Sequence, residues 1–336
     1  MKIVVVANAK GGVGKTTLAV NLAIRAACGE VPEIDPDKNV LICDMDAQQN
    51  TSQTLLQMES AGSNDYLLPP IHPDYDPETD FEWDGRSSST DIYYDQDVVP
   101  YPTVFSRLDV LPANGDHLEL FQNLTKNVTD ESLLDQICDH FRKFIEGDDV
   151  REEYDLIIFD TPPGKNFITI PVFRAASDIV MPFKPEGFSI EGLAKMKASI
   201  ENENAYRTEP VNISGMVPNL VKHNNKHRDT LAALGENQEV APLLWDTLLH
   251  DRVAFVLDNM PLSETSYRYQ DAKAEQEMSA LVRRFRAAVY GADFVSEGEL
   301  EVTGKASEEE GGGSAFNPPE TSALEESAEG DVTYGT

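Results

Sequence analysis

The amino-acid sequence predicts one α/β domain, with a mostly parallel twisted sheet and helices on both of its faces. Short runs of four apolar residues recur along the chain, as in residues 3–6, 40–43 and 156–159, and each suits a strand that is buried on both sides. Stretches with apolar residues at helical spacing separate these runs. Such an alternation of strands and helices is typical of a parallel sheet with helical crossovers.

Length and composition are compatible with this class. The chain has 336 residues, of which 40% are hydrophobic, and this suffices for one large domain with a packed core. The cysteines Cys28, Cys43 and Cys138 are scattered, as expected for reduced thiols. No apolar run approaches the ~20 residues of a membrane span, and the N-terminus lacks the layout of a signal peptide. We therefore expect a cytoplasmic protein.

The first strand is followed by a glycine-rich turn and a helix over residues 18–24. The turn reads Ala9-Lys10-Gly11-Gly12-Val13-Gly14-Lys15-Thr16-Thr17. Glycines let backbone N–H groups close around phosphate oxygens, and the helix N-terminus adds partial positive charge. Lys15 is expected to reach the β- and γ-phosphates, and the Thr16 hydroxyl to bind Mg²⁺. The pattern G-x-x-x-x-G-K-[ST] fails only at Ala9, and Lys10 follows as a second lysine.

Carboxylates follow two of the later strands. Asp44 and Asp46 come after the strand at residues 40–43, where parallel sheets bind ligands, so they can hold Mg²⁺ or orient a water. The alternative is a turn whose polar residues cap the next helix. Asp160 follows the strand at residues 156–159, and beside Lys15 and Thr16 it suits a carboxylate on the water shell of Mg²⁺.

The remaining elements complete the alternation. We expect strands at residues 108–112, 179–182, 211–219 and 243–249, and helices near residues 118–125, 131–145, after 186 and from 271 to 290. Asn219 stands at the end of the strand at residues 211–219. Its amide can pair with a purine edge or serve the turn.

Two regions carry most of the formal net charge of −32. Residues 60–105 are acidic, with prolines that forbid a long helix and aromatic residues too numerous for disorder, so we expect an insertion partly packed on the domain surface. A partner-binding role for this insertion stays open. Residues 291–336 form an acidic, glycine-rich stretch that we expect to be a disordered tail beyond an ATPase domain at residues 1–290. Bulk acidity can also reflect a salty cytoplasm.

Taken together, these motifs resemble the ParA/MinD-type deviant Walker A P-loop ATPases, and the ParA partition branch most. The resemblance covers residues 1–58 and 106–290 and implies the P-loop NTPase fold. The segments that carry it are AKGGVGKTT, DMDAQQNTS, IIFDTPPG, SDIVMPFKPEGFSIEGL, VPN and TLLHDRVAF.

The resemblance assigns roles to the motif residues. It implies that Lys10 reaches across an ATP-bound homodimer to the partner's phosphates, and that Asp46 orients the attacking water. It places Asp44 near Mg²⁺ and makes Asp160 the Walker B carboxylate. The remaining nucleotide contacts it implies are Thr17 to the α-phosphate, Asn219 to adenine, and the loop residues Gly11, Gly12, Val13, Gly14, Lys15 and Thr16. This implies a slow, Mg²⁺-dependent ATPase that a partner stimulates.

The sequence departs from the family at a few places. Ala47 and Gln49 stand where the family usually has Pro and Gly, so backbone freedom is reduced there. Neither the insertion nor the tail is a family feature. We expect no additional DNA-binding domain before the phosphate-binding loop, and this disfavours a site-specific repressor.

The resemblance leaves two main functions in competition. In DNA partition, ATP-bound dimers bind DNA non-specifically on the nucleoid, and a ParB-like activator triggers hydrolysis. The candidate DNA contacts, which alternatively are solvated cations, are Lys222, Lys226, Arg228, Arg283, Arg284 and Arg286. The alternative is a MinD-like membrane-associated positioning ATPase, but the acidic C-terminal stretch is unlike a basic membrane-binding helix, so no membrane partner is expected. A third possibility, a metal-cluster or biosynthetic relative from the same superfamily, lacks support, because no cysteine of this chain follows the Asp160 strand where an iron–sulfur ligand would be expected.

Overall fold

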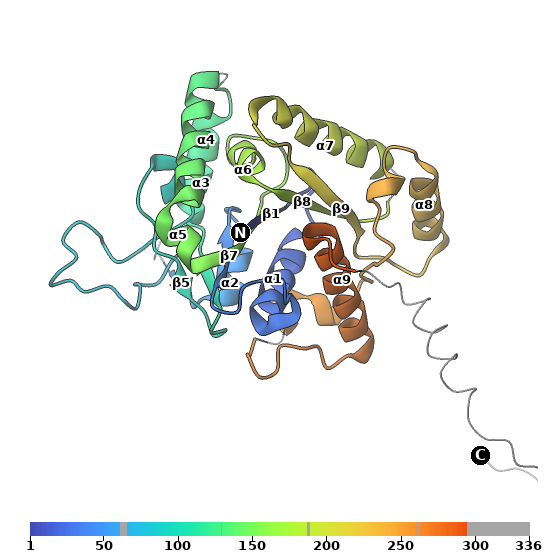
Figure 1. Ribbon diagram of the computed structural model, residues 1–336, viewed down its shortest axis with the longest axis horizontal. Coiled ribbons are helices and arrows are strands. Elements are labelled where there is room, and N and C mark those ends of the chain that lie inside the picture. Colours follow the sequence, from blue (N-terminus) through green and yellow to red (C-terminus); the bar gives the residue numbers. More distant parts are fainter. Residues whose placement is uncertain (61–65, 129, 187–188, 261, 294–336) are drawn as a thin grey trace, which may run out of the picture. The chain divides into compact units, whose positions relative to one another are not determined.

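A seven-stranded, mostly parallel sheet forms the centre of the protein (Figure 1). The computed structural model describes residues 1–60, 66–128, 130–186, 189–260 and 262–293. The strand order is β5-β6-β2-β7-β1-β8-β9, and only β5 runs antiparallel to its neighbour. Their bounds are β1 Lys2–Val6, β2 Asn39–Asp44, β5 Tyr101–Pro102, β6 Leu108–Leu111, β7 Tyr154–Asp160, β8 Asp178–Phe183 and β9 Asn212–Pro218. The predicted fold class is thereby confirmed.

Helices cover both faces of this sheet, as the sequence predicts. Side chains of β1 alternate between two core clusters, with Val4 and Val6 in one and Val5 in the other. In the first cluster helices α1 and α9 pack against one face of the sheet, and in the second helices α3, α4, α6 and α7 pack against the other face. The helices are α1 Lys15–Arg25, α2 Asn50–Leu55, α3 Gly115–Thr125, α4 Glu131–Glu146, α5 Asp148–Glu153, α6 Thr169–Ala175, α7 Ser189–Glu203, α8 Asn225–Glu236 and α9 Ala272–Tyr290. Within the part of the chain that the structure describes, no helix is both long and apolar enough to span a bilayer.

The insertion packs against the domain along much of its described length. Its strand β5 extends the sheet beside β6, with Tyr101 opposite Val110. Tyr93 and Tyr101 are buried, whereas Phe81 is 85% exposed. A short antiparallel pair, β3 at Glu59–Ser60 and β4 at Leu67–Leu68, forms at its start.

Residues 243–249 do not form the strand that the sequence analysis expects. They contact β9 through one isolated bridge, from Leu244 to Met216, and through the backbone amides of Trp245 and Leu249, which donate to the carbonyls of Met216 and Pro218. Two features interrupt a ladder here. The indole of Trp245 packs over Gly215 and donates to the Ser214 carbonyl, and Pro218 of β9 has no N–H to donate.

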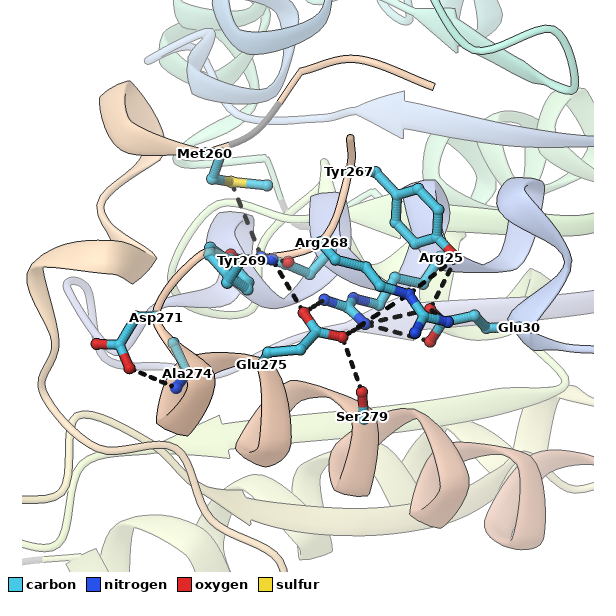
Figure 2. Close-up of polar contacts among 11 residues, drawn as sticks. Arg25, Glu30, Met260, Tyr267, Arg268, Tyr269, Asp271, Ala274, Glu275 and Ser279 are labelled. Atoms are coloured by element: carbon cyan, nitrogen blue, oxygen red, sulfur yellow. Dashed lines mark hydrogen bonds and ion pairs between the residues drawn. The ribbon is translucent and has the colours of Figure 1, made fainter. Parts of the chain in front are cut away.

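A buried ion network ties helix α1 to helix α9 (Figure 2). The Arg25 guanidinium, whose side chain is 1% exposed, donates to both Glu275 oxygens at 2.6 and 2.9 Å and to Glu30. The Tyr267 hydroxyl also donates to Glu30, and the Tyr269 amide to Glu275. Helix α9 ends at Gly291 in the left-handed conformation, which glycine adopts readily. Most of the predicted acidic tail, residues 294–336, lies outside the described residues.

Candidate functional site

The expected site residues converge at one edge of the sheet. Strand β7 lies between β1 and β2, and its last residue, Asp160, is opposite both Val6 and Asp44. Because all three strands are parallel, their carboxyl ends meet there. The phosphate-binding loop leaves β1 at this edge, so it lies beside both acidic strand ends.

Two glycines of the loop have backbone angles that other residues rarely adopt. Gly12 has φ +68° and Gly14 has φ +81°, and Gly14 is the N-cap residue of α1. A Cβ on Gly14 would lie 2.2 Å from Nδ2 of Asn219. Gly14 is therefore required both by the conformation of the loop and by this close approach.

Asn219 holds the loop from the end of β9. Its Nδ2 donates to the Val13 carbonyl at 2.9 Å, and its Oδ1 accepts from the Leu220 amide at 2.8 Å. The side chain is nearly buried. The turn role that the sequence left open is thus observed, while the contact with adenine stays a prediction.

Lys15 points toward the two acidic strand ends. It is 7% exposed, and burial lowers its pKa while the charges of Asp160 and Asp46 raise it. A buried lysine interacts strongly with an opposite charge, so bound phosphate would stabilise the charged form of Lys15. The geometry suits the predicted contact with the terminal phosphates.

Asp160 is buried, and one of its oxygens has no partner. Its Oδ2 accepts from the Thr51 hydroxyl at 2.8 Å, whereas Oδ1 is buried without a hydrogen bond. Burial raises the pKa of Asp160, which the Thr16 and Thr51 hydroxyls partly oppose. A buried acceptor without a donor is costly. The residues present therefore fit a Mg²⁺ ion with its waters, held by Asp160 and the Thr16 hydroxyl.

The two acids after β2 have different surroundings. Asp44 is fully buried, and its Oδ2 accepts from the amide and hydroxyl of Ser52 in α2 at 2.9 and 2.7 Å. Burial and the nearby Asp160 raise its pKa. Asp44 thus holds α2, as the turn alternative expected, and a contact with Mg²⁺ stays a prediction. Asp46 is only partly buried, so its carboxylate remains accessible to a water.

Lys10 is exposed and pairs with an acid outside its own loop. Its side chain is 63% exposed, and Nζ lies 3.1 Å from Oε2 of Glu186. Lys184 pairs with the other Glu186 oxygen at 2.8 Å. These two lysines lower the pKa of Glu186 to about 2. The two lysines of the loop therefore face different partners.

The sequence analysis did not single out three polar residues that shape this site. The amide of Asn8 donates to the Pro182 carbonyl, and its Oδ1 accepts from the Lys10 amide at 2.9 Å. Thr51 donates to Asp160, as described above, and the Thr161 hydroxyl donates to the Val6 carbonyl. Thr51 and Thr161 lie within the quoted segments DMDAQQNTS and IIFDTPPG, but only the contacts reveal their roles.

The candidate DNA-binding residues lie near α8 and on α9. Several of them pair with acids: Lys222 with Asp251, Arg228 with Asp229, and Arg284 with Asp246. Arg286 pairs with Glu33, and its Nε and Nη2 both donate to the Glu33 carboxylate. Lys226 and Arg283 are exposed. A DNA contact for these six residues stays a prediction.

A comparison with protein families decides the affiliation of the chain. The model of a family described as "AAA domain" matches residues 1–213, which contain the phosphate-binding loop and all three acids. The chain belongs to this family, as a ParA/MinD-type P-loop ATPase.

Known relatives within the ParA/MinD type agree with this assignment. The chain is 26% identical over 244 residues to the chromosome partitioning protein ParA of Caulobacter vibrioides, covering 69% of this chain and 74% of the relative. It is 28% identical over 221 residues to the sporulation initiation inhibitor protein Soj of Bacillus subtilis, covering 64% and 71%. Cyanothece McdA without ligand shares the fold, with a TM-score of 0.61 at 18% identity over 84% of this chain and 99% of McdA.

Proposed function

We propose that this ParA/MinD-type protein is a partition or positioning ATPase, in which an ATP-bound homodimer binds DNA non-specifically and partner-stimulated hydrolysis releases it. The observation that carries the proposal is the opposite placement of the two loop lysines. Lys15 is buried beside Asp46 and Asp160, whereas Lys10 is exposed beside Glu186. One lysine serves the phosphates bound by its own subunit, and the other is available to a second subunit.

The site residues divide the work of phosphoryl transfer. Lys15 and the backbone N–H groups of the loop bind and orient the phosphates of ATP. Thr16 and Asp160 would hold Mg²⁺ with its waters, and the bound ion would supply charge neutralisation for the phosphates. Asp46 orients the attacking water. Because positioning and charge neutralisation carry most of this reaction, these few residues suffice for slow hydrolysis.

Dimerisation would complete the site. When two subunits close on ATP, Lys10 would leave Glu186 and contact the partner's phosphates. The exposed Lys10–Glu186 pair contributes little energy, since surface ion pairs are worth ~0–1 kcal/mol. Phosphate charge is thus a strong enough competitor to move the lysine.

The DNA-binding surface is proposed to centre on the exposed cations. Lys222, Lys226, Arg228 and Arg283 are exposed, whereas Arg286 is only partly exposed beside Glu33. A chain with a net charge of −32 must concentrate its cations to attract a polyanion. We expect these four exposed cations to contribute most, with the protein on the nucleoid when ATP is bound.

Partition is the role that the names of the relatives support. ParA of Caulobacter vibrioides is named for chromosome partitioning. By analogy, the activating partner of this chain is a ParB-like protein that docks on the ATP-bound dimer. The cargo is a plasmid, a chromosome or another assembly.

The structure offers little to the membrane-bound alternative. The apolar residues Met278, Leu281, Phe285 and Val289 of α9 are buried in the core, so this helix has no free apolar face for a bilayer.

A gel shift with duplex DNA tests the proposal. The protein is incubated with ATP or with ADP at low salt, beside a pelleting assay with anionic lipid vesicles. We expect a shift with ATP that is lost with ADP and weakens steeply as salt rises, because binding releases counterions. Pelleting with vesicles and no DNA shift would favour the membrane role and contradict partition.

A further inference from the structure

Gln49 adopts a backbone conformation that suits the glycine the family usually has there. Its φ is +58° and its ψ is 25°, in the left-handed region, where residues with a Cβ are uncommon. Its side chain is nevertheless 1% exposed. A glutamine that is both strained and buried calls for a compensating contact.

The Gln49 amide clasps the start of the insertion. Nε2 donates to the carbonyls of Leu67 at 2.7 Å and Ala113 at 2.8 Å, and Oε1 accepts from the Leu67 amide at 2.9 Å. Both amide protons and the oxygen are thus used. Leu67 belongs to β4 of the insertion, so Gln49 pairs with it as a neighbouring strand would.

Close packing around Gly115 leaves little room for this contact to slip. A Cβ on Gly115 would lie 2.5 Å from Cδ1 of Tyr66, 2.6 Å from the Ala47 carbonyl oxygen and 3.0 Å from Cδ of Gln49. The Tyr66 hydroxyl also donates to Glu119 in α3. The insertion, the loop after β2 and the start of α3 therefore meet at one point.

The same turn carries the acid that is proposed to orient the water. The backbone N–H of Gln49 donates to the backbone carbonyl of Asp46 at 2.9 Å. A second contact comes from elsewhere in the insertion, where the Ser89 hydroxyl donates to the Asp44 carbonyl at 2.5 Å. A shift of the insertion would thus move the backbone on both sides of Met45, and a displacement of about 1 Å can cost about 100-fold in rate.

We propose that Gln49 is a positioning residue through which the insertion at residues 66–105 sets the placement of Asp46. This inference rests on the proposed role of Asp46 in hydrolysis. A protein that docks on the insertion would change the rate of ATP turnover through the side-chain amide of Gln49. Because such coupling is reciprocal, Mg²⁺-ATP bound at the loop would change the protection of the insertion's backbone amides from hydrogen exchange.

The test compares three variants of the full chain. Gln49→Gly removes the clasp and relieves the strain, Gln49→Ala removes the clasp and keeps the strain, and Gln48→Ala is the control, since the Gln48 side chain is exposed in the same turn. Steady-state hydrolysis gives kcat and KM for ATP. Hydrogen exchange of residues 66–72 is followed with and without Mg²⁺-ATP.

We expect both Gln49 variants to lower kcat about tenfold while KM changes less than about twofold. Exchange at residues 66–72 should respond to Mg²⁺-ATP in the wild type and in Gln48→Ala, but not in Gln49→Gly. Unchanged kcat in Gln49→Gly despite lost protection would mean that Gln49 only anchors the insertion. Where turnover is too slow to measure, the exchange response alone decides, and its absence in the wild type overturns the coupling. A failure of the proposed function looks different, since the wild type would then bind no ATP or Asp46→Ala would hydrolyse it normally.

Discussion

Lys10 forms an ion pair with Glu186, with Nζ 3.1 Å from Oε2, although it lies in the same loop as the buried Lys15. The acid comes soon after β8, and it also pairs with Lys184. This contact ties the exposed Lys10 to a residue outside its own loop. In a single subunit Lys10 is therefore paired with Glu186, and we expect dimerisation to move it to the phosphates bound by the partner.

Replacing Lys10 with alanine should separate binding from turnover. We expect Lys10→Ala to bind ATP with an affinity within about threefold of the wild type, and to lose about 100-fold in turnover, because transition-state charge across the dimer goes unneutralised. Light scattering with ATP should show monomers. The matched variant Glu186→Gln frees the lysine and should dimerise at least as readily. Normal turnover in Lys10→Ala would exclude the two-subunit site.

Asp46→Ala is expected to trap the ATP-bound dimer. The variant keeps Lys15, Thr16 and Asp160, so binding and dimerisation should persist. Hydrolysis should fall about 100-fold, because the attacking water loses its orienting acceptor. Size-exclusion chromatography with ATP would show a lasting dimer. Hydrolysis at the wild-type rate would show that another residue orients the water.

Gly14→Ala tests the close approach to Asn219. The new Cβ would lie 2.2 Å from Nδ2 and force a side chain onto a residue with φ +81°. We expect nucleotide affinity to fall about tenfold or more, since left-handed strain costs ~1–2 kcal/mol before the clash is counted. The control is Gly235→Ala in α8, where a Cβ meets nothing within 4 Å. Adding Asn219→Ala should remove the clash and recover part of the melting temperature of Gly14→Ala. If the melting temperature did not recover, the backbone strain at residue 14 would account for the whole loss, and the clash with Asn219 for none of it.

The stability of the unliganded protein should fall as pH rises through neutrality. Burial raises the pKa of Asp44 to about 7 and that of Asp160 to about 6. A carboxyl with a raised folded pKa favours the fold when protonated, so its contribution is complete below pH ~4, is lost progressively from there up to about pH 6 to 7, and no longer changes at higher pH. We expect a loss of the order of 2 kcal/mol between pH 5 and 8 in urea denaturation. Asp44→Asn should flatten this dependence, and an equally steep curve in that variant would contradict the assignment.

Removing Glu275 should destabilise the domain strongly. The side chain of Arg25 is 1% exposed, and Glu275 supplies both of its shortest contacts (Figure 2). Because Glu275→Ala leaves a buried charge with only Glu30 to pair it, we expect the free energy of unfolding to drop by about 3 kcal/mol. Glu33→Ala is the control, since its pair with Arg286 is more exposed and should be worth less than about 1 kcal/mol. Equal losses in the two variants would mean that burial of the Arg25 pair is unimportant.

Much of the site could be predicted from the sequence because its chemistry is local. Loop residues 9–17 are consecutive, and their glycines, lysines and threonines fit phosphate and Mg²⁺ whatever surrounds them. Asp160 could be placed because the end of a buried parallel strand is fixed by its apolar run. The expected strand at residues 243–249 was wrong, since the apolar pattern does not reveal that Trp245 crosses over Gly215.

The sequence by itself determined the fold class, the phosphate-binding loop and which acids stand at the strand ends. Those features follow from periodicity and from the chemistry of neighbouring residues. Only the tertiary structure decided that Asn219 holds Val13, that Lys10 faces Glu186 and that Gln49 clasps Leu67. The physical reason is that these contacts join segments that lie far apart along the chain or depend on one backbone angle, and neither leaves a periodic trace in the sequence.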